Sequence, residues 1–411
     1  MRVDVRALVA RLLDELPIVD VHTHLYDPAM GELLLAGPDE LLTYHYHVAE
    51  LFRARPDLDP EAFFAMPREV RADLVWRELF VKRSPLSEPG RGLVTLWRAF
   101  GLDPSAGDLR EARACFAERL RDPRAHVDDV LARARVREVC MTNDPLDPRE
   151  RACWERGFPR DPRFVAALRL DSAIMDWPRA VPALRALGCD VEDGLSARSI
   201  DALRRYLVAW HGRFDARYMA VSLPPEIGYP DGGQKTWLAL LERAVLPAAE
   251  ELGTPLALMI GVRRQVNPRL RLAGDSVGVP DVESIERLAH AYPRVRFLVT
   301  LLSREGQHAL CVAARKFANL EPFGCWWFVN VPSVAREITA MRLDLLGPNF
   351  VPQHSDARVL EQLLSKWERS RRWLAEVLGD QYADLAAAGG VVDEARVRRD
   401  LIAMLGRGFA R

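Results

Sequence analysis

From Val136 onward, short apolar segments rich in β-branched residues alternate with longer segments of helical periodicity. Strands that alternate with helices predict a parallel sheet, because each crossover helix must pack on a face of that sheet. A further strand is expected earlier, just after Pro17. Eight strands are the number that closes a (β/α)8 barrel, which is the fold that this alternation predicts. The expected strands are 18–22, 136–141, 164–168, 218–222, 256–260, 297–301, 326–329 and 349–351.

The segment 26–135 separates the first expected strand from all the others and is mostly of helical pattern, as at Val48, Leu51 and Phe52. It is too long for an ordinary connection between a strand and a helix. The sequence therefore predicts two parts. Residues 1–25 and 136–411 would form the barrel, and residues 26–135 a helical insertion subdomain after the first strand.

Composition excludes some classes of partner. The chain has 57 basic and 58 acidic residues, so it has no overall field that would attract nucleic acid or an anionic membrane. Charges interrupt every apolar segment before it reaches the length of a membrane span. The N-terminus lacks the apolar run of a signal peptide, and six cysteines without a C-x-x-C pair favour free thiols. We expect a cytoplasmic protein. The sequence leaves its oligomeric state open, a homo-oligomer included.

The sharpest local pattern is Asp20-Val21-His22-Thr23-His24, at the carboxyl end of the first expected strand. Residues two apart on a strand point to the same side, so His22 and His24 would both face the barrel mouth, where barrel enzymes keep their sites. Two neutral imidazoles on one side suit a divalent transition metal. A pair of packed or surface histidines is the alternative, and the tripeptide alone does not decide between them.

A second pattern, His354-Ser355-Asp356-Ala357-Arg358, follows the last expected strand. Asp356 could be a metal ligand or a general base, and Arg358 could bind an anionic group through its planar guanidinium. The alternative is a helix start capped by Ser355 or Asp356. Closure of a barrel would bring this segment beside the first strand, and so beside the two histidines.

Three weaker patterns complete the candidates. Tyr44, His45 and Tyr46 form an aromatic cluster in the insertion that could carry protons or could simply pack. Arg169 ends a strand and could bind an anion or form a surface ion pair with Asp171. Trp326 and Trp327 follow a glycine and could wall a sugar-sized pocket or lie in the core.

Taken together, these residues resemble the uronate isomerases, a branch of the amidohydrolase superfamily. The resemblance covers most of the chain and depends on the order of its elements. These are Asp20–His24, His45-Tyr46, Thr142-Asn143-Asp144-Pro145, Arg169, Ile260-Gly261 followed by 263–267, Gly324-Cys325-Trp326-Trp327-Phe328 and Ser355–Arg358.

The resemblance implies an aldose–ketose isomerase of hexuronic acids on a distorted (β/α)8 TIM barrel, with a role in carbohydrate metabolism. D-glucuronate would be converted to D-fructuronate, and D-galacturonate to D-tagaturonate. His22, His24 and Asp356 would hold a divalent metal, usually zinc. Asp356, Tyr46 and His45 would take part in proton transfer between C2 and C1. The sugar acid would be bound by Arg169, Arg358, Trp326, Trp327 and His354.

The chain departs from the family pattern at two places. Met259 stands where those isomerases carry a histidine, and the segment Val221-Ser222-Leu223-Pro224 lacks their aspartate. A thioether cannot transfer protons and is a poor ligand for zinc beside imidazole and carboxylate. Two other functions therefore stay open: hydrolysis of a small carboxylate-bearing substrate, and binding of a sugar acid without catalysis.

Overall fold

The computed structural model describes residues 4–406. Seven parallel strands form one curled sheet in these residues, in the order β1-β2-β3-β4-β5-β8-β9. The strands are β1 (Ile18–Thr23), β2 (Val136–Asn143), β3 (Phe164–Arg169), β4 (Met219–Leu223), β5 (Leu256–Ile260), β8 (Phe297–Leu301) and β9 (Leu320–Pro322). A separate antiparallel pair, β6 (Val262–Arg263) and β7 (Ser276–Val277), follows β5. The α/β class and the parallel sheet are as expected.

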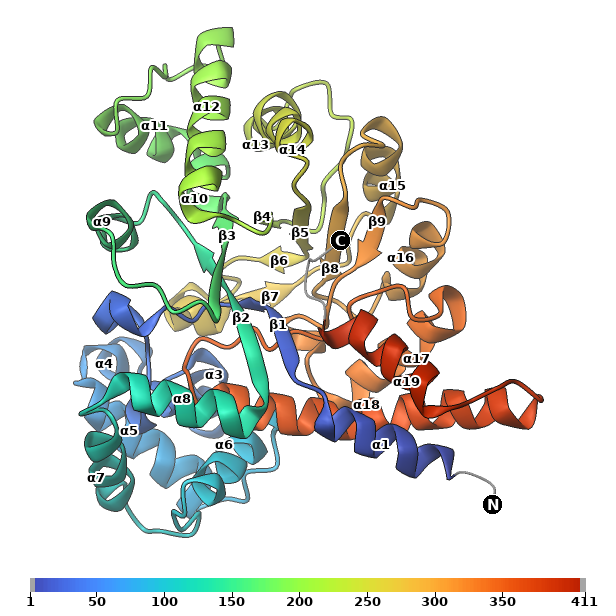
Figure 1. The fold of residues 1–411 in the computed structure, drawn as a ribbon. Helices are drawn as coiled ribbons and strands as arrows, with labels where there is room; N and C mark the ends of the chain where they lie inside the picture. The colour runs from blue at the N-terminus through green and yellow to red at the C-terminus, as the bar shows by residue number, and fades with distance from the viewer. Residues whose placement is uncertain (1–3, 407–411) are drawn as a thin grey trace.

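Helices lie outside the curled sheet (Figure 1). From β2 to the C-terminus they are α9 (Pro148–Arg156), α10 (Asp171–Ile174), α11 (Trp177–Ala186), α12 (Ala197–Phe214), α13 (Thr236–Leu240), η3 (Leu241–Val245), α14 (Leu246–Leu252), η4 (Pro268–Gly274), α15 (Val282–Ala291), α16 (Gln307–Ala314), η5 (Trp327–Val329), α17 (Pro332–Leu346), α18 (Gln362–Ala387), α19 (Glu394–Leu401) and η6 (Ile402–Gly406). Helix α1 (Val5–Glu15) precedes β1 and packs on α18.

Every described element between β1 and β2 is helical, and these helices gather in one part of the molecule (Figure 1). Several of them begin at an aspartate or serine whose side chain accepts a backbone N–H, as Asp122 does for α8, which satisfies a donor that a helix start leaves free. Whether residues 26–135 fold as a unit stays a prediction. The helices are η1 (Pro28–Leu33), α2 (Pro38–Leu42), α3 (His45–Ala54), α4 (Pro60–Ala65), α5 (Arg68–Trp76), η2 (Arg77–Val81), α6 (Glu88–Ala99), α7 (Arg110–Arg119) and α8 (Pro123–Ala134).

The prediction of a strand at 326–329 is wrong. The strand lies earlier, at Leu320–Pro322, and the chain turns at Gly324, which has a positive φ of 68°. A Cβ at Gly324 would overlap the ring of His354, so only glycine allows the two segments to approach this closely. The turn takes Trp326 and Trp327 out of the sheet, and Trp327–Val329 form a 3-10 helix.

The expected strand at 349–351 is reduced to a single bridge between Val351 and Phe323. Beyond it the chain is bonded to β1: the Asp356 N–H donates to the His22 carbonyl over 3.1 Å, and the His24 N–H donates to the Ala357 carbonyl over 2.7 Å. These bonds join the two edges of the curled sheet. They bring residues 354–358 beside His22 and His24, as barrel closure was expected to do.

The inside of the curled sheet is filled by a small apolar cluster, and its larger core lies between the sheet and the helices. Val19 and Val21 belong to the inner cluster. The pairing of β1 with β2 is irregular between Asp20 and Thr23, which changes the alternation of side chains at that point. His22 therefore joins Val21 on the inside, whereas Asp20 contacts α18.

The structure also bears on the cysteines and on membrane spans. Within residues 4–406 all six cysteines are free thiols. No helix in the described part of the chain has the length and apolar character needed to cross a bilayer.

Candidate active site

A cavity of about 560 Å³ opens at the carboxyl ends of the strands. This is the end where parallel α/β folds place their ligands, because side chains from many strands and loops converge there. Most of the predicted site residues line it. The lining residues are His22, His24, Tyr44, His45, Thr142, Arg169, Asp171, Ala220, Val221, Ser222, Met259, Arg264, Leu272, Trp326, Trp327, Asp356 and Arg358.

His22 and His24 converge on Asp356. The Nε2 atom of His24 lies 3.3 Å from the Asp356 carboxylate oxygen Oδ1, and that of His22 lies 3.7 Å from the same oxygen. One ligand atom of each residue falls within 4.8 Å of those of the other two. The three residues are close enough together to be candidate ligands of a single ion.

A hydroxyl group contacts the Nδ1 atom of each imidazole, on the side of the ring away from Asp356. His22 Nδ1 lies 2.9 Å from the Tyr218 hydroxyl, which donates to the Val21 carbonyl over 3.0 Å. His24 Nδ1 lies 2.9 Å from the Thr142 hydroxyl, which donates to the Thr23 carbonyl over 2.9 Å. A hydroxyl has one proton. Since each hydroxyl gives that proton to a backbone carbonyl, it can only accept from the histidine.

This arrangement fixes the tautomer of each histidine. Both Nδ1 atoms carry the proton, so both Nε2 atoms present a lone pair toward Asp356. Burial lowers the pKa of His24 to about 4 and that of His22 well below its ordinary value, so both rings are neutral near pH 7. His22 Nε2 and Asp356 Oδ1 have no hydrogen-bond partner among the described residues.

The charge of Asp356 completes the donor set. Burial opposes its ionisation, but the nearby Lys366 ammonium favours the charged form, and the pKa of this carboxyl lies below its ordinary value. Two imidazole lone pairs and a carboxylate thus face one point with no proton between them. A cation at that point would turn this repulsion into attraction, and the residues fit a divalent metal.

The backbone of Asp356 is itself unusual. Its φ is +51°, in the left-handed region, which costs a residue with a side chain about 1–2 kcal/mol. Trp327, which also lines the cavity, has a φ of +47°. Non-glycine residues in this region cluster at sites where the surrounding structure holds them for a function.

Two arginines approach the cavity from different elements. Arg169 ends β3, and its Nε lies 3.3 Å from the Asp171 carboxylate, so the predicted ion pair is present and lies in the cavity wall. Arg358 follows Asp356. Its Nε is buried without a hydrogen-bond partner in the described structure, and it therefore keeps a donor for an anionic ligand.

The aromatic cluster of α3 lies beside the cavity. Tyr44 and His45 line it, and both ring nitrogens of His45 lack a hydrogen-bond partner among the described residues. Tyr46 does not line the cavity but is half-buried behind them, with its ring centroid 4.4 Å from that of His45. It packs on the group formed by Met259, Val262, Leu302, Trp326 and Trp327.

His354 does not line the cavity. It is buried beneath the site, with ring centroids 5.1 Å from both His22 and Phe323. Trp326 and Trp327 do line it, as expected for a pocket wall. The Trp327 ring lies 5.2 Å from that of His45, which joins this wall to the helical region.

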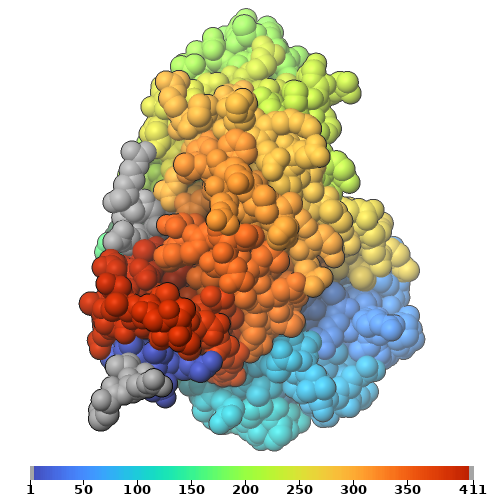
Figure 2. Space-filling model, turned by 90° about the vertical axis from the view of Figure 1, so that its right-hand side faces the viewer, coloured from blue at the N-terminus to red at the C-terminus, as the bar shows by residue number. Residues whose placement is uncertain are grey.

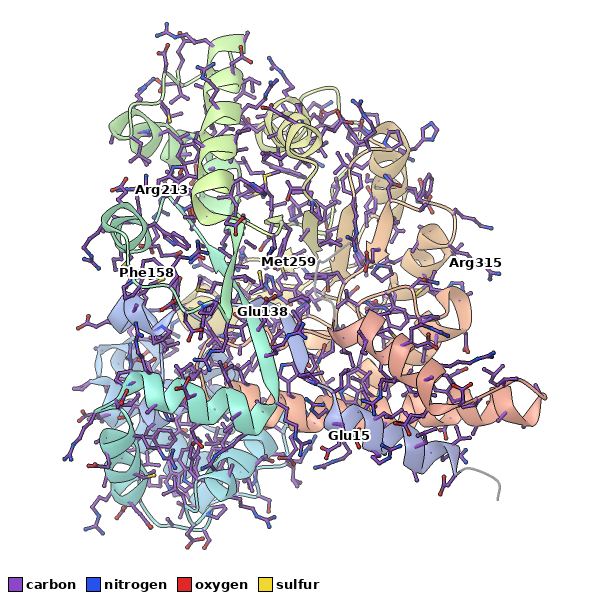
Figure 3. The ribbon with its side chains drawn as sticks, in the orientation of Figure 1. Glu15, Glu138, Phe158, Arg213, Met259 and Arg315 are labelled. Carbon is purple, nitrogen blue, oxygen red and sulfur yellow. The ribbon has the colours of Figure 1, made fainter. Side chains whose placement is uncertain are left out.

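The two departures from the family pattern face the same cavity. Ser222 and Met259 both line it, and they are paired in register between β4 and β5. Figure 3 places Met259 among the strands, while Glu15 and Arg315 lie at the periphery. Neither Ser222 nor Met259 brings a carboxylate or an imidazole to the cavity.

Sequence reasoning placed Tyr44 in the aromatic cluster and Asp171 in an ion pair, and it assigned no separate role to Arg264, Thr142 or Tyr218. Tyr44, Asp171 and Arg264 line the cavity and lie within two residues of selected motifs, or in segment 263–267. Their position next to a selected motif was the one sequence signal that could have assigned them to the site. Thr142 and Tyr218 are 118 and 196 residues from the histidines that they orient, and no local pattern indicates such a pairing.

The fold and site define an α/β protein with a cavity and a candidate metal site at the carboxyl ends of a curled parallel sheet. Among solved structures, the chain is similar to a uronate isomerase from Bacillus halodurans, with 45% identity, a TM-score of 0.95 and coverage of 100% of this chain and 96% of that one. The chain belongs to the uronate isomerase family.

Two more distant structures share the fold. A uronate isomerase from Thermotoga maritima has 18% identity and a TM-score of 0.75, covering 97% of this chain and 95% of that one. A glucuronate isomerase from Caulobacter crescentus has 16% identity and a TM-score of 0.73, covering 98% and 92%. No protein-family model matches the chain, and no curated protein matches it.

Proposed function

We propose that the protein interconverts the aldose and ketose forms of a hexuronic acid, D-glucuronate with D-fructuronate and D-galacturonate with D-tagaturonate. The observation that carries the proposal is one cavity that holds His22, His24 and Asp356 together with Arg169 and Arg358. Membership in the uronate isomerase family supports it. We also propose that the curled sheet is a distorted (β/α)8 barrel, because the bonds of residues 354–358 to β1 replace its eighth strand.

The reaction moves a proton between C2 and C1, which requires a base at C2 and a proton donor near the carbonyl oxygen. Asp356 is the proposed base. It is ionised, its Oδ1 makes no hydrogen bond within residues 4–406, and it lines the cavity. We propose Tyr46 as the proton donor: burial raises the pKa of its phenol well above the ordinary value, so it keeps its proton. His45 would hold the same end of the substrate.

The substrate's permanent carboxylate needs a cationic partner. Arg169 and Arg358 are the proposed partners for the carboxylate and neighbouring hydroxyls, because a guanidinium binds such groups through paired hydrogen bonds. Trp326 and Trp327 would exclude water from one side of the sugar. His354 supports His22 from below, and we propose no direct contact with substrate for it.

We propose that His22, His24 and Asp356 hold a divalent metal, zinc being the best match to imidazole and carboxylate ligands. When bound, the metal would supply positive charge that stabilises developing negative charge on the substrate oxygens. The locked histidine tautomers support this assignment.

The test is formation of ketose from D-glucuronate and D-galacturonate, followed by proton NMR. The protein would be assayed after chelator treatment and again after zinc is restored, with an Asp356→Asn variant as the control for background isomerisation. Conversion of either sugar that Asp356→Asn lacks would support the proposal. No ketose from either sugar with zinc bound would reject it.

A further inference from the structure

Asp356 sits in a strained backbone conformation, and the segment around it is held by groups that do not line the cavity. Three of these groups are buried: Asp20 on β1, and Lys366 and Trp367 on α18. Asp20 begins the histidine motif, but it is not a metal ligand in this geometry. Its side chain points away from the cavity toward α18.

Asp20 binds two donors with its two carboxylate oxygens. The Ser355 N–H donates to Oδ1 over 3.0 Å, and the Trp367 indole N–H donates to Oδ2 over 2.8 Å. A buried carboxylate that accepts two such bonds is fixed in place. Asp20 therefore connects helix α18 to the residue immediately before Asp356.

Lys366 holds the carbonyl group of Ser355. Its ammonium donates to the Ser355 carbonyl over 2.5 Å. The N–H of Ser355 is thus held by Asp20 and its carbonyl by Lys366, while the Asp356 N–H donates to the His22 carbonyl. The peptides on either side of Ser355 cannot rotate without breaking a buried hydrogen bond, and the second of them is the peptide that precedes Asp356.

We propose that Asp20, Lys366 and Trp367 form a clamp that holds Asp356 in its left-handed conformation and so aims its carboxylate at His22 and His24. They are positioning residues, because none of them lines the cavity. The consequence for metal affinity rests on the metal site proposed above. The consequence for the Asp356 backbone does not.

The experiment compares Trp367→Phe with Trp373→Phe. Both tryptophans are buried and lie on α18, so both variants lose similar packing, but only Trp367→Phe loses a bond to Asp20. Zinc affinity is measured by competition with a chromophoric chelator, the melting temperature by calorimetry, and the Asp356 backbone by crystal structures of both variants.

We expect Trp367→Phe to weaken zinc binding by about 10–100-fold, the usual effect of losing a group that orients a metal ligand. Trp373→Phe should keep the affinity of the natural protein at a similar melting temperature. In the crystal structures, Asp356 should leave the left-handed region in Trp367→Phe but not in Trp373→Phe. Lys366→Met removes a different donor to the same segment and should act in the same direction.

Unchanged zinc affinity and an unchanged Asp356 backbone in both Trp367→Phe and Lys366→Met would overturn the clamp. If the natural protein binds no zinc, the metal site proposed above fails. The crystal structures then decide alone: a displaced Asp356 in Trp367→Phe but not in Trp373→Phe supports the clamp, and an undisplaced one overturns it.

Discussion

The side of the cavity formed by β1 and residues 354–358 differs from the side formed by β4 and β5 in how its groups are held. On the first side, His22, His24 and Asp356 are each fixed by a hydrogen bond to another residue of the chain. On the second side, the lining residues Ala220–Ser222 and Met259 include no titratable side chain. In the proposed function, the first side would therefore carry the acid–base chemistry and the second would only shape the space.

Replacing Asp356 by Asn should have the largest effect. It removes the proposed base and one charge of the proposed metal site, so we expect kcat to fall by about 10²–10⁴-fold, the range for loss of a general base. Steady-state rates on D-glucuronate, with zinc content measured in parallel, test this. Activity within threefold of the natural protein would show that the base lies elsewhere, and the comparison of the two sides would then be broken.

Tyr46→Phe and Tyr44→Phe should separate two roles within the aromatic cluster. The proposed proton donor is Tyr46, and its loss should lower kcat by about 10²-fold. Burial raises the pKa of the Tyr44 phenol, and the neighbouring Arg358 guanidinium opposes that rise. Because Tyr44 lies beside a proposed substrate-binding arginine, Tyr44→Phe should mainly raise KM. The opposite pattern of kcat and KM would assign proton transfer to Tyr44.

Arg358→Ala tests recognition of the substrate's carboxylate. Losing a hydrogen bond to a charged group costs about 1.5–3 kcal/mol, so KM should rise about 10–150-fold. The substrate series should include the neutral aldose that lacks the carboxylate. An equal loss for the neutral sugar would mean that Arg358 does not bind the carboxylate.

Thr142→Val and Tyr218→Phe test the locked tautomers. Each removes a hydroxyl that accepts from a histidine Nδ1–H, and we expect zinc affinity to fall by about 10–100-fold. Thr300→Val offers a control, since Thr300 is a buried threonine on β8 whose hydroxyl has no hydrogen-bond partner within the described residues. Equal affinities in all three variants would contradict the role given to the hydroxyls.

Met259→Leu should have the smallest effect. Leucine keeps the volume of methionine, so stability should change by less than about 1.5 kcal/mol and kcat should stay within twofold. Thermal unfolding and steady-state kinetics check both. A tenfold fall in kcat would show that the β4–β5 side takes part in the reaction.

The sequence predicted the parts of the site that depend on local pattern. His22 and His24 follow from their spacing on a strand, and Asp356 from its place after the last extended segment. The prediction of a strand at 326–329 failed because the chain turns at Gly324, next to the ring of His354. Such a turn depends on a long-range contact. Thr142, Tyr218 and Trp367 could not be predicted, because their partners are distant in the chain.

The helical region meets η4 at the wall of the cavity, and local pattern does not indicate this contact. Both line the cavity, η4 through Leu272. Arg269 binds Asp59 over 2.5 Å, and Arg271 lies over the Phe64 ring. Figure 2 shows this segment, in yellow, beside the blue surface of the helical region. The wall of the site is therefore shared between segments that sequence reasoning placed in separate parts.

Deuterium incorporation tests the central claim most directly. The natural protein and Asp356→Asn would each be incubated with D-glucuronate in heavy water, and proton NMR would follow the hydrogen at C2. The account predicts loss of that signal with the natural protein, as ketose forms, and none with Asp356→Asn. Equal exchange in both would contradict it, because the β1 side would then not carry the proton transfer.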